Sequence, residues 1–325
     1  MGNRSRVIKY AALALALITV VLASAYFTAV ESGIRSVKAA YTAAGSYSFG
    51  WISDTQNYSQ SYPEIFTSMT NWLKAEAGGR IKYLFHTGDV VNTMTDEKQW
   101  QNALSAMQVL DGSLSYSIAA GNHDVGRDEV DYTRFLEYFG RIGEGTGRDI
   151  EWYGDGVVTA ERFEAGRTRY LVLAIGYGAG KDALDWAGEL LSRHSEYITI
   201  LITHDYMRAD GRLSDNGQLL LEKLVRGHPS VRLVLCGHNH NAEKNILPLD
   251  DDGDGKADRT VIQLLADYQA MPNGGGGYIR LLTIDEKKKT LSVTTYSPYY
   301  DDYDCFEPIT HPQKDSFEIS IKDWF

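Results

Sequence analysis

Short apolar runs alternate with stretches of helical periodicity along the chain from about residue 47 onward. The apolar runs are typical of buried strands and comprise YSFGWIS, IKYLFHT, SYSIAA, RYLVLAIG, YITILIT and VRLVLCG. Helices are predicted in four stretches: YPEIFTSMTNWLKAEAGG, TDEKQWQNALSAMQVLDG, KDALDWAGELLSRH and NGQLLLEKLVRGH. Pro63 lies in the first turn of the first helix, and Thr95 is the expected N-cap of the second. Strands that are apolar on both faces and alternate with helices indicate a largely parallel sheet covered by helices.

The pattern changes after residue 260. TVIQLLADYQ, GYIRLLTID and LSVTTYS follow one another without an intervening helix, which predicts antiparallel hairpins that complete a second sheet. The glycine-rich stretch 273–278 between the first two is predicted to be a flexible hairpin tip. Because no repeat or Pro/Ser-rich linker interrupts the chain, we expect one α/β domain over residues 47–300, with residues 301–325 as an extension that packs on it.

The first forty residues differ in kind from the rest. Arg4, Arg6 and Lys9 precede an uncharged apolar run over residues 10–30, and this order is an export signature. The run is longer than the ~7–15 residues of most signal peptides and reaches the ~20 needed to span a bilayer. Small residues at 23–25 and near 39 offer cleavage sites. A cleaved signal peptide and a retained membrane anchor both stay open for residues 1–40, and both place the remainder outside the cytoplasm.

The charge of the chain argues against one class of partner. The formal net charge is −11, and the remainder is more acidic still because residues 1–40 hold more basic than acidic side chains. An acidic body repels extended polyanions, so we expect no nucleic-acid binding and membrane contact only through the N-terminal segment. Cys236 lies in an apolar run and is expected to be a buried small side chain, with a disulfide to Cys305 as the alternative.

Polar clusters follow five of the predicted strands: SDTQ (53–56), GDVVN (88–92), GNHD (121–124), THDY (203–206) and GHNH (237–240). Functional side chains collect at the carboxyl ends of strands in open α/β sheets. One such cluster is consistent with ordinary turn chemistry, but five together indicate a metal site. Their oxygen and nitrogen donors, without a thiolate, suit Mn, Fe or Zn. The donors are Asp54, Gln56, Asp89, Asn122, His204, His238 and His240.

The order D-x-Q, GDxxN, GNHD, H and GHxH over residues 48–240 resembles the calcineurin-like metallophosphoesterase superfamily, as an exported bacterial member with a DTQ variant of the first motif. The resemblance implies an α/β two-sheet sandwich flanked by helices, and two divalent metal ions (Mn, Fe or Zn) that serve phosphate-ester hydrolysis. It implies that one ion is held by Asp54, Gln56, Asp89 and His240. Asp89 would bridge to the second ion, which Asn122, His204 and His238 complete.

The same resemblance assigns His123 as the general acid that protonates the leaving oxygen. Gln56 replaces a histidine ligand of many members and is a weaker, neutral donor. Asn92 replaces an acid that orients the catalytic histidine, and an amide fixes the ring without stabilising an imidazolium. Asp124, next to His123, is expected to take part of that role. We interpret both replacements as variation within the superfamily and expect activity to be retained.

Two further patterns allow two interpretations each. Asp250, Asp252, Asp254 and Asp258 stand at calcium-loop positions, but Val261 occupies the place of the bidentate glutamate, so structural calcium binding and an exposed acidic turn stay open. Arg127 and Arg208 follow two of the ligand clusters. Each is either a clamp for a substrate phosphate or a surface arginine.

The predicted function is that of an exported metal-dependent hydrolase of phosphate esters, acting on a small-molecule or polymer substrate. The alternative is a non-catalytic, metal-containing surface-binding protein on the same fold. His123 distinguishes the two, because a scaffold has no need for a non-ligand acid beside the metals.

Overall fold

The computed structural model describes residues 18, 19, 21, 24, 45–308, 310, 311 and 313–325. The predicted signal peptide or anchor at residues 1–40 therefore lies almost wholly outside the described residues. Within the described part of the chain, no helix is both long enough and apolar enough to cross a membrane.

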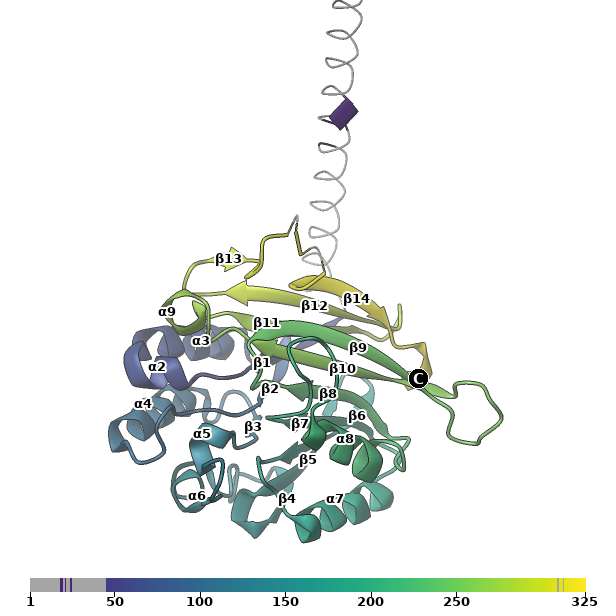
Figure 1. Cartoon of the computed structure of the whole chain (residues 1–325), viewed down its shortest axis with the longest axis horizontal. Coiled ribbons are helices and arrows are strands. Elements are labelled where there is room, and N and C mark those ends of the chain that lie inside the picture. The colour runs from purple at the N-terminus through teal and green to yellow at the C-terminus, as the bar shows by residue number, and fades with distance from the viewer. Residues whose placement is uncertain (1–17, 20, 22–23, 25–44, 309, 312) are drawn as a thin grey trace, which may run out of the picture.

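Two mixed sheets, each of seven strands in the described residues, form the centre of the molecule (Figure 1). The first has the order β13-β12-β11-β1-β2-β3, with β14 also paired to β12. Its strands are β1 (Tyr47–Ile52), β2 (Ile81–His86), β3 (Tyr116–Ile118), β11 (Ile279–Asp285), β12 (Thr290–Ser297), β13 (Asp302–Tyr303) and β14 (Ser316–Ser320). Strands β1, β2 and β3 are parallel to one another, and the other pairings in this sheet are antiparallel.

The second sheet has the order β4-β5-β6-β7-β8-β10-β9. Its strands are β4 (Asp149–Tyr153), β5 (Val158–Ala165), β6 (Thr168–Ile175), β7 (Ile198–Thr203), β8 (Val231–Cys236), β9 (Asn241–Leu249) and β10 (Arg259–Asp267). Strands β6, β7, β8 and β10 are parallel, whereas β4, β5 and β9 add antiparallel edges.

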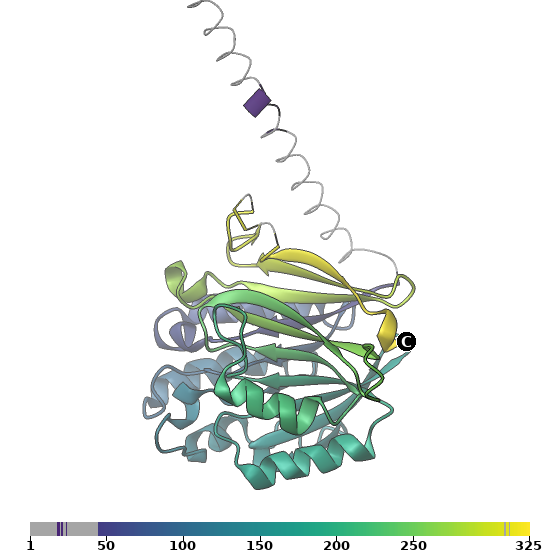
Figure 2. The same cartoon turned by 45° about the vertical axis from the view of Figure 1, so that its right-hand side comes forward.

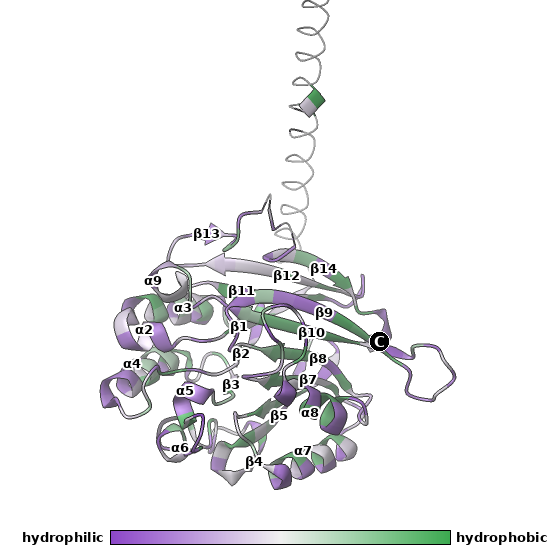
Figure 3. Ribbon diagram, in the orientation of Figure 1, coloured by the Kyte–Doolittle hydropathy of each residue, from purple (hydrophilic) through white to green (hydrophobic). Residues whose placement is uncertain are grey.

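Helices cover the outer face of each sheet, and a third apolar layer lies between the sheets (Figures 1 and 2). Alternate residues of one strand serve different layers: Ile200 and Ile202 of β7 face the other sheet, whereas Leu201 packs under the helices. Figure 3 shows the apolar interior of both sheets in green. The helices are α2 (Gln56–Ser61), α3 (Pro63–Glu76), α4 (Glu97–Met107), α5 (Asn122–Val125), α6 (Thr133–Phe139), α7 (Lys181–Arg193), α8 (Asp215–Leu220) and α9 (Pro272–Gly275).

This architecture confirms the predicted two-sheet α/β sandwich and adds elements that the sequence pattern did not indicate. Strands β4, β5 and β9 and the short helices α2, α5 and α6 were not predicted. The N-cap of α4 is Asp96, whose Oδ1 accepts a hydrogen bond from the Lys98 amide at 3.0 Å, and not Thr95. Strand β10 is parallel to β8, whereas only antiparallel pairing was predicted after residue 260.

The glycine-rich stretch differs from its predicted form as a hairpin tip. It connects β10 of one sheet to β11 of the other, and every residue over 273–277 has a positive φ. The loop packs on α2, where the Tyr58 hydroxyl accepts a hydrogen bond from the Gly277 amide at 2.9 Å. The sequence of four glycines therefore serves a left-handed turn that L-residues adopt only at a cost.

The C-terminal residues continue the first sheet. Strand β14 pairs with β12, and Phe317 and Ile321 bury their side chains in the layer between the sheets. Cys236 and Cys305 are both free thiols, and Cys236 is fully buried, as its apolar surroundings in the sequence predicted.

Candidate metal centre

The five predicted clusters lie at one end of the sandwich, where β1, β2 and β3 of one sheet meet β7 and β8 of the other. Backbone contacts join the loops within each sheet: the Asp54 amide donates to the Gly88 carbonyl at 2.9 Å, and the Gly237 amide to the His204 carbonyl at 3.0 Å. Across the sheets, the His238 amide donates to the Asp54 carboxylate at 3.2 Å. The loops of both sheets therefore build a single site.

The turns of this site are tight and strained. Asp54, Asp89 and His238 all have positive φ, at 53°, 54° and 73°. Non-glycine residues rarely adopt this region, and such strain is concentrated at functional sites. The motif glycines leave room for the carboxylates: a Cβ on Gly237 would lie 2.1 Å from Oδ2 of Asp54.

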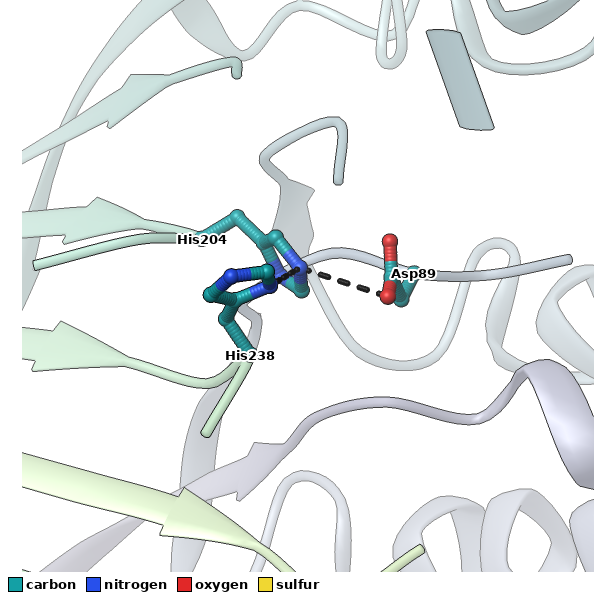
Figure 4. A group of neighbouring side chains, drawn as sticks. All are labelled: Asp89, His204 and His238. Atoms are coloured by element: carbon teal, nitrogen blue, oxygen red, sulfur yellow. Dashed lines mark hydrogen bonds and ion pairs between the residues drawn. The ribbon is translucent and has the colours of Figure 1, made fainter. Parts of the chain in front are cut away.

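Four predicted ligands converge at the centre of the site. Nε2 of His204 lies 3.3 Å from Oδ2 of Asp89, 3.2 Å from Nδ1 of His238 and 3.1 Å from the side-chain amide of Asn122. Figure 4 shows Asp89, His204 and His238 directed toward one another. Donor atoms around one tetrahedral ion at ~2.0–2.1 Å lie at about these mutual separations. Asp89, Asn122, His204 and His238 are the set that the sequence assigned to the second ion.

The hydrogen bonds and charges of these four side chains are also those of a cation site. Nδ1 of His204 donates to the Thr87 carbonyl at 2.9 Å, which directs the Nε2 lone pair into the site. The Asn122 side chain faces the same point: its oxygen is a ligand atom in one orientation of the amide, and in the other orientation its nitrogen donates to Nε2 of His204 at 3.1 Å and to Nδ1 of His238 at 2.8 Å. Burial lowers the pKa of His204, but the carboxylates of Asp89 and Asp54 outweigh this effect and raise it to about 10. A divalent ion would supply the charge that these carboxylates otherwise draw from a proton.

The ligands assigned to the first ion are less closely gathered. Asp54 and Gln56 are buried, and Nε2 of Gln56 donates to Oδ2 of Asp89 at 3.1 Å. The amide oxygen of Gln56 is buried and has no hydrogen-bond partner, which is consistent with a missing electropositive ligand. The His240 ring is 56% exposed, and its Nε2 lies 2.9 Å from the side-chain nitrogen of Gln269. In the described residues, neither Asp54 nor His240 joins the compact donor group around Asp89.

One buried carboxylate of this region was missed. Asp267 ends β10, is 2% exposed and places Oδ2 3.8 Å from Nε2 of His240. The sequence signal was available, because Asp267 follows the apolar run TVIQLLA just as Asp54 and Asp89 follow the first and second apolar runs. It was not used because β10 was predicted to belong to an antiparallel hairpin.

The surroundings of His123 differ from those predicted. Its Nδ1 donates to the backbone carbonyl of Asn92 at 2.8 Å, whereas the Asn92 side chain donates to Oε1 of Gln60 at 3.1 Å. The Asp124 carboxylate accepts hydrogen bonds from the backbone amides of Val90, Val91 and Gly121 and fixes two loops of the site. Neither side chain therefore orients the ring, and the role predicted for Asp124 is replaced by a structural one.

We expect Asn92→Ala to leave turnover within about threefold of wild type, less than ~0.7 kcal/mol in the barrier. The backbone carbonyl that holds His123 is retained in this variant, and only the bond to Gln60 is lost. Steady-state kinetics with a poor leaving group checks this. A loss as large as that of a His123 variant would show that the side chain is the orienting group.

The two candidate substrate residues lie at different places. Nε of Arg127 is 2.9 Å from the Asn122 side-chain amide and hence beside the donor group. Arg208 forms an exposed ion pair with Asp215 at 3.1 Å. It also lines a cavity of about 430 Å³ together with Asp205, Ser214 and His238. Both arginines border the site, and phosphate binding by them stays a prediction.

The acidic stretch 250–258 forms the exposed loop between β9 and β10, drawn in purple in Figure 3. Carboxylate oxygens of Asp250, Asp252 and Asp254 lie within 4.8 Å of one another. The Asp250 carboxylate accepts hydrogen bonds from the amides of Gly253 and Gly255, and Oδ2 of Asp258 accepts one from the Asp251 amide. Val261 is buried in β10, so no twelfth-position ligand is present. Calcium binding stays a prediction.

Comparisons with known proteins agree with this geometry. The model of the calcineurin-like phosphoesterase family matches residues 47–242, more than half of the chain. The uncharacterized protein YvnB of Bacillus subtilis (strain 168) is 40% identical over 282 residues, which cover 85% of this chain and 22% of that protein. This chain thus spans about a fifth of the length of that relative.

This chain is also similar to a solved structure, and that similarity supports the fold alone. The purple acid phosphatase PPD1 from yellow lupin (Lupinus luteus) seeds superposes with a TM-score of 0.55 and 14% identity, over 85% of this chain and 54% of that one. The strand order, the donor group at the strand ends and the matched family model lead to one conclusion. The chain belongs to the calcineurin-like phosphoesterase family.

Proposed function

We propose that this protein is an exported hydrolase of phosphate esters that uses two divalent metal ions and His123 as general acid. The observation that carries the proposal is the position of Asp89, His238 and Asn122 around Nε2 of His204, at 3.3, 3.2 and 3.1 Å. The family match supports a metal-dependent phosphoesterase, and the residues of the site fit such ions.

Each group of the chain has a distinct task in the proposed reaction. Bound divalent ions supply positive charge to the phosphate oxygens and make water a nucleophile near neutral pH. Asp89 lies between Gln56, His204 and the His123 amide, and its Oδ2 contacts side chains of both predicted ligand sets. Arg127 offers a guanidinium beside this group for a phosphate oxygen.

His123 is the proposed proton donor. Because Nδ1 donates to the Asn92 carbonyl, the proton that the ring exchanges is on Nε2. Protonated Nε2 donates to the leaving oxygen as the ester bond breaks, and this contribution is typically ~10²–10⁴-fold. The backbone anchor keeps the ring orientation independent of the residue type at position 92.

A screen of metal-reconstituted protein tests the proposal. Protein without metal is loaded separately with Mn²⁺, Fe²⁺ and Zn²⁺ and assayed against chromogenic phosphate monoesters and diesters. We expect hydrolysis of at least one class, lost on chelation and restored on reloading. A protein that binds two ions and hydrolyses neither class supports the alternative, a metal-containing surface-binding protein.

The proposal includes a location outside the cytoplasm, because a basic segment precedes the uncharged run at residues 10–30. Cell fractionation followed by amino-terminal sequencing tests it. We expect mature protein that begins near residue 26 or 40, or full-length protein in the membrane fraction. Soluble cytoplasmic protein that begins at Met1 would refute export.

A further inference from the structure

Asp267 is a further buried carboxylate at the edge of the metal centre. Asp54, Asp89 and Asp267 are 1%, 1% and 2% exposed. In the part of the chain that the structure describes, Asp89 and Asp267 form ion pairs only with histidines, His204 and His240, and Asp54 forms none. Several buried carboxylates without a Lys or Arg partner are costly unless a cation is bound.

The topology explains how Asp267 reaches this site. Strand β10 is parallel to β8, with Leu265 opposite Cys236, so the carboxyl ends of both strands lie at the same edge of the sheet. The β8 end continues into His238 and His240, and the β10 end into Asp267. Strand β9 then returns beside β10, with Asn241 opposite Asp267. The chain thus has a sixth strand end at the site, in addition to the five that carry the family motifs.

The surroundings of Asp267 connect it to the ligands of the first ion. It interacts electrostatically with Asp54, and its Oδ2 lies 3.8 Å from Nε2 of His240, too far for a hydrogen bond. Among the described residues, its carboxylate accepts hydrogen bonds from Gln269 alone, whose amide donates to Oδ1 at 2.9 Å and whose side chain donates to Oδ2 at 3.4 Å. Oδ2 is therefore poorly satisfied and lies beside His240, and the charge of Asp267 raises the pKa of Asp54.

The first ion is also the one that lacks a strong donor. Gln56 replaces a histidine there, and a neutral amide oxygen binds a divalent ion more weakly than an imidazole nitrogen. The Gln56 oxygen is buried without a partner in this same region. An additional carboxylate would offset the weaker donor.

We propose that Asp267 is a further ligand of the ion assigned to Asp54, Gln56, Asp89 and His240, an inference that rests on the proposed two-metal function. The resulting donor set is mostly oxygen, with a single imidazole. Oxygen donors suit hard ions such as Mn²⁺, whereas the position with two histidines suits Zn²⁺.

Metal counting gives the first test. Wild type, Asp267→Asn and Asp315→Asn are reconstituted with Mn²⁺ and analysed for metal content after timed exposure to a chelator. Asp267→Asn preserves the shape of the side chain but removes its charge. Asp315 is a matched control, because it is also a buried aspartate whose carboxylate accepts a backbone amide, that of Phe306, outside the site. We expect wild type and Asp315→Asn to retain two ions and Asp267→Asn to retain one.

A spectroscopic test separates a direct ligand from a residue that only orients His240. In Asp267→Cys loaded with Co²⁺, a thiolate bound to the ion produces a sulfur-to-cobalt charge-transfer band in the near ultraviolet. Asp315→Cys controls for the added thiol and should show no band. We expect the band in Asp267→Cys alone.

The outcomes separate this inference from the proposed function. Two ions retained by Asp267→Asn as firmly as by wild type, or no band in cobalt-loaded Asp267→Cys that still binds two ions, would overturn the ligand role and leave the two-metal function intact. Wild-type protein that binds fewer than two ions under any loading condition would overturn the two-metal function itself.

Discussion

Asp89→Asn is expected to abolish phosphoesterase activity and to deplete both metal positions. Asp89 is the carboxylate that contacts both ligand sets: its Oδ2 lies 3.1 Å from Gln56 and 3.3 Å from His204. An amide at this position is uncharged and has a single oxygen, so it would hold ions at the two positions less well than the carboxylate would. Losing the ions removes several kcal/mol of charge stabilisation in the transition state, and 4 kcal/mol corresponds to about 10³-fold in rate.

Elemental analysis and turnover measured on the same preparation check this prediction. The fold of the variant is verified by circular dichroism, because Oδ1 of Asp89 also accepts the His123 amide at 2.8 Å and the residue occupies a strained turn. Asp315→Asn is the control for the loss of a buried carboxylate elsewhere. A folded Asp89→Asn protein that keeps two ions and more than a tenth of its activity would show that another group bridges.

Strands that are buried on both faces could be predicted from the sequence. The runs that became β1, β2, β6, β7 and β8 are almost continuously apolar, and each was predicted. The missed strands have other patterns: β4 and β5 carry charges such as Glu151 and Arg162, which pair with each other across the strands. Strand β9 is an edge strand with Pro248 in it. Mixed and edge strands lack the burial signal on which the prediction depended.

The sequence also placed the candidate ligands at one end of the sheets, because parallel strands end at a common edge. It did not show which of these strands belong to which sheet, since pairing depends on contacts distant in the chain. Asp267 was missed for this reason. The sequence of β10 is compatible with an antiparallel hairpin strand and with a parallel strand, and only its pairing with β8 distinguishes the two. Likewise, the type of residue at position 92 does not reveal that its carbonyl, and not its side chain, holds His123.

His123→Ala is expected to keep both metal ions and to lose ~10²–10⁴-fold in turnover on esters with poor leaving groups. The ring contacts the Asn92 carbonyl through Nδ1, and only its backbone amide contacts Asp89, so removing the ring leaves the ligands in place. A leaving alkoxide of high pKa needs a proton in the transition state. A nitrophenolate leaving group needs little protonation, so hydrolysis of nitrophenyl esters should be much less affected.

Kinetics over a series of leaving groups, with metal content measured in parallel, checks this. The dependence of log(kcat/KM) on leaving-group pKa should be steeper for His123→Ala than for wild type, because the wild-type enzyme protonates the oxygen as the bond breaks. Asn92→Ala is the matched control and should retain the wild-type slope, since it keeps the carbonyl that orients the ring. Equal losses for all leaving groups would refute the acid role, and loss of one ion would make His123 a ligand.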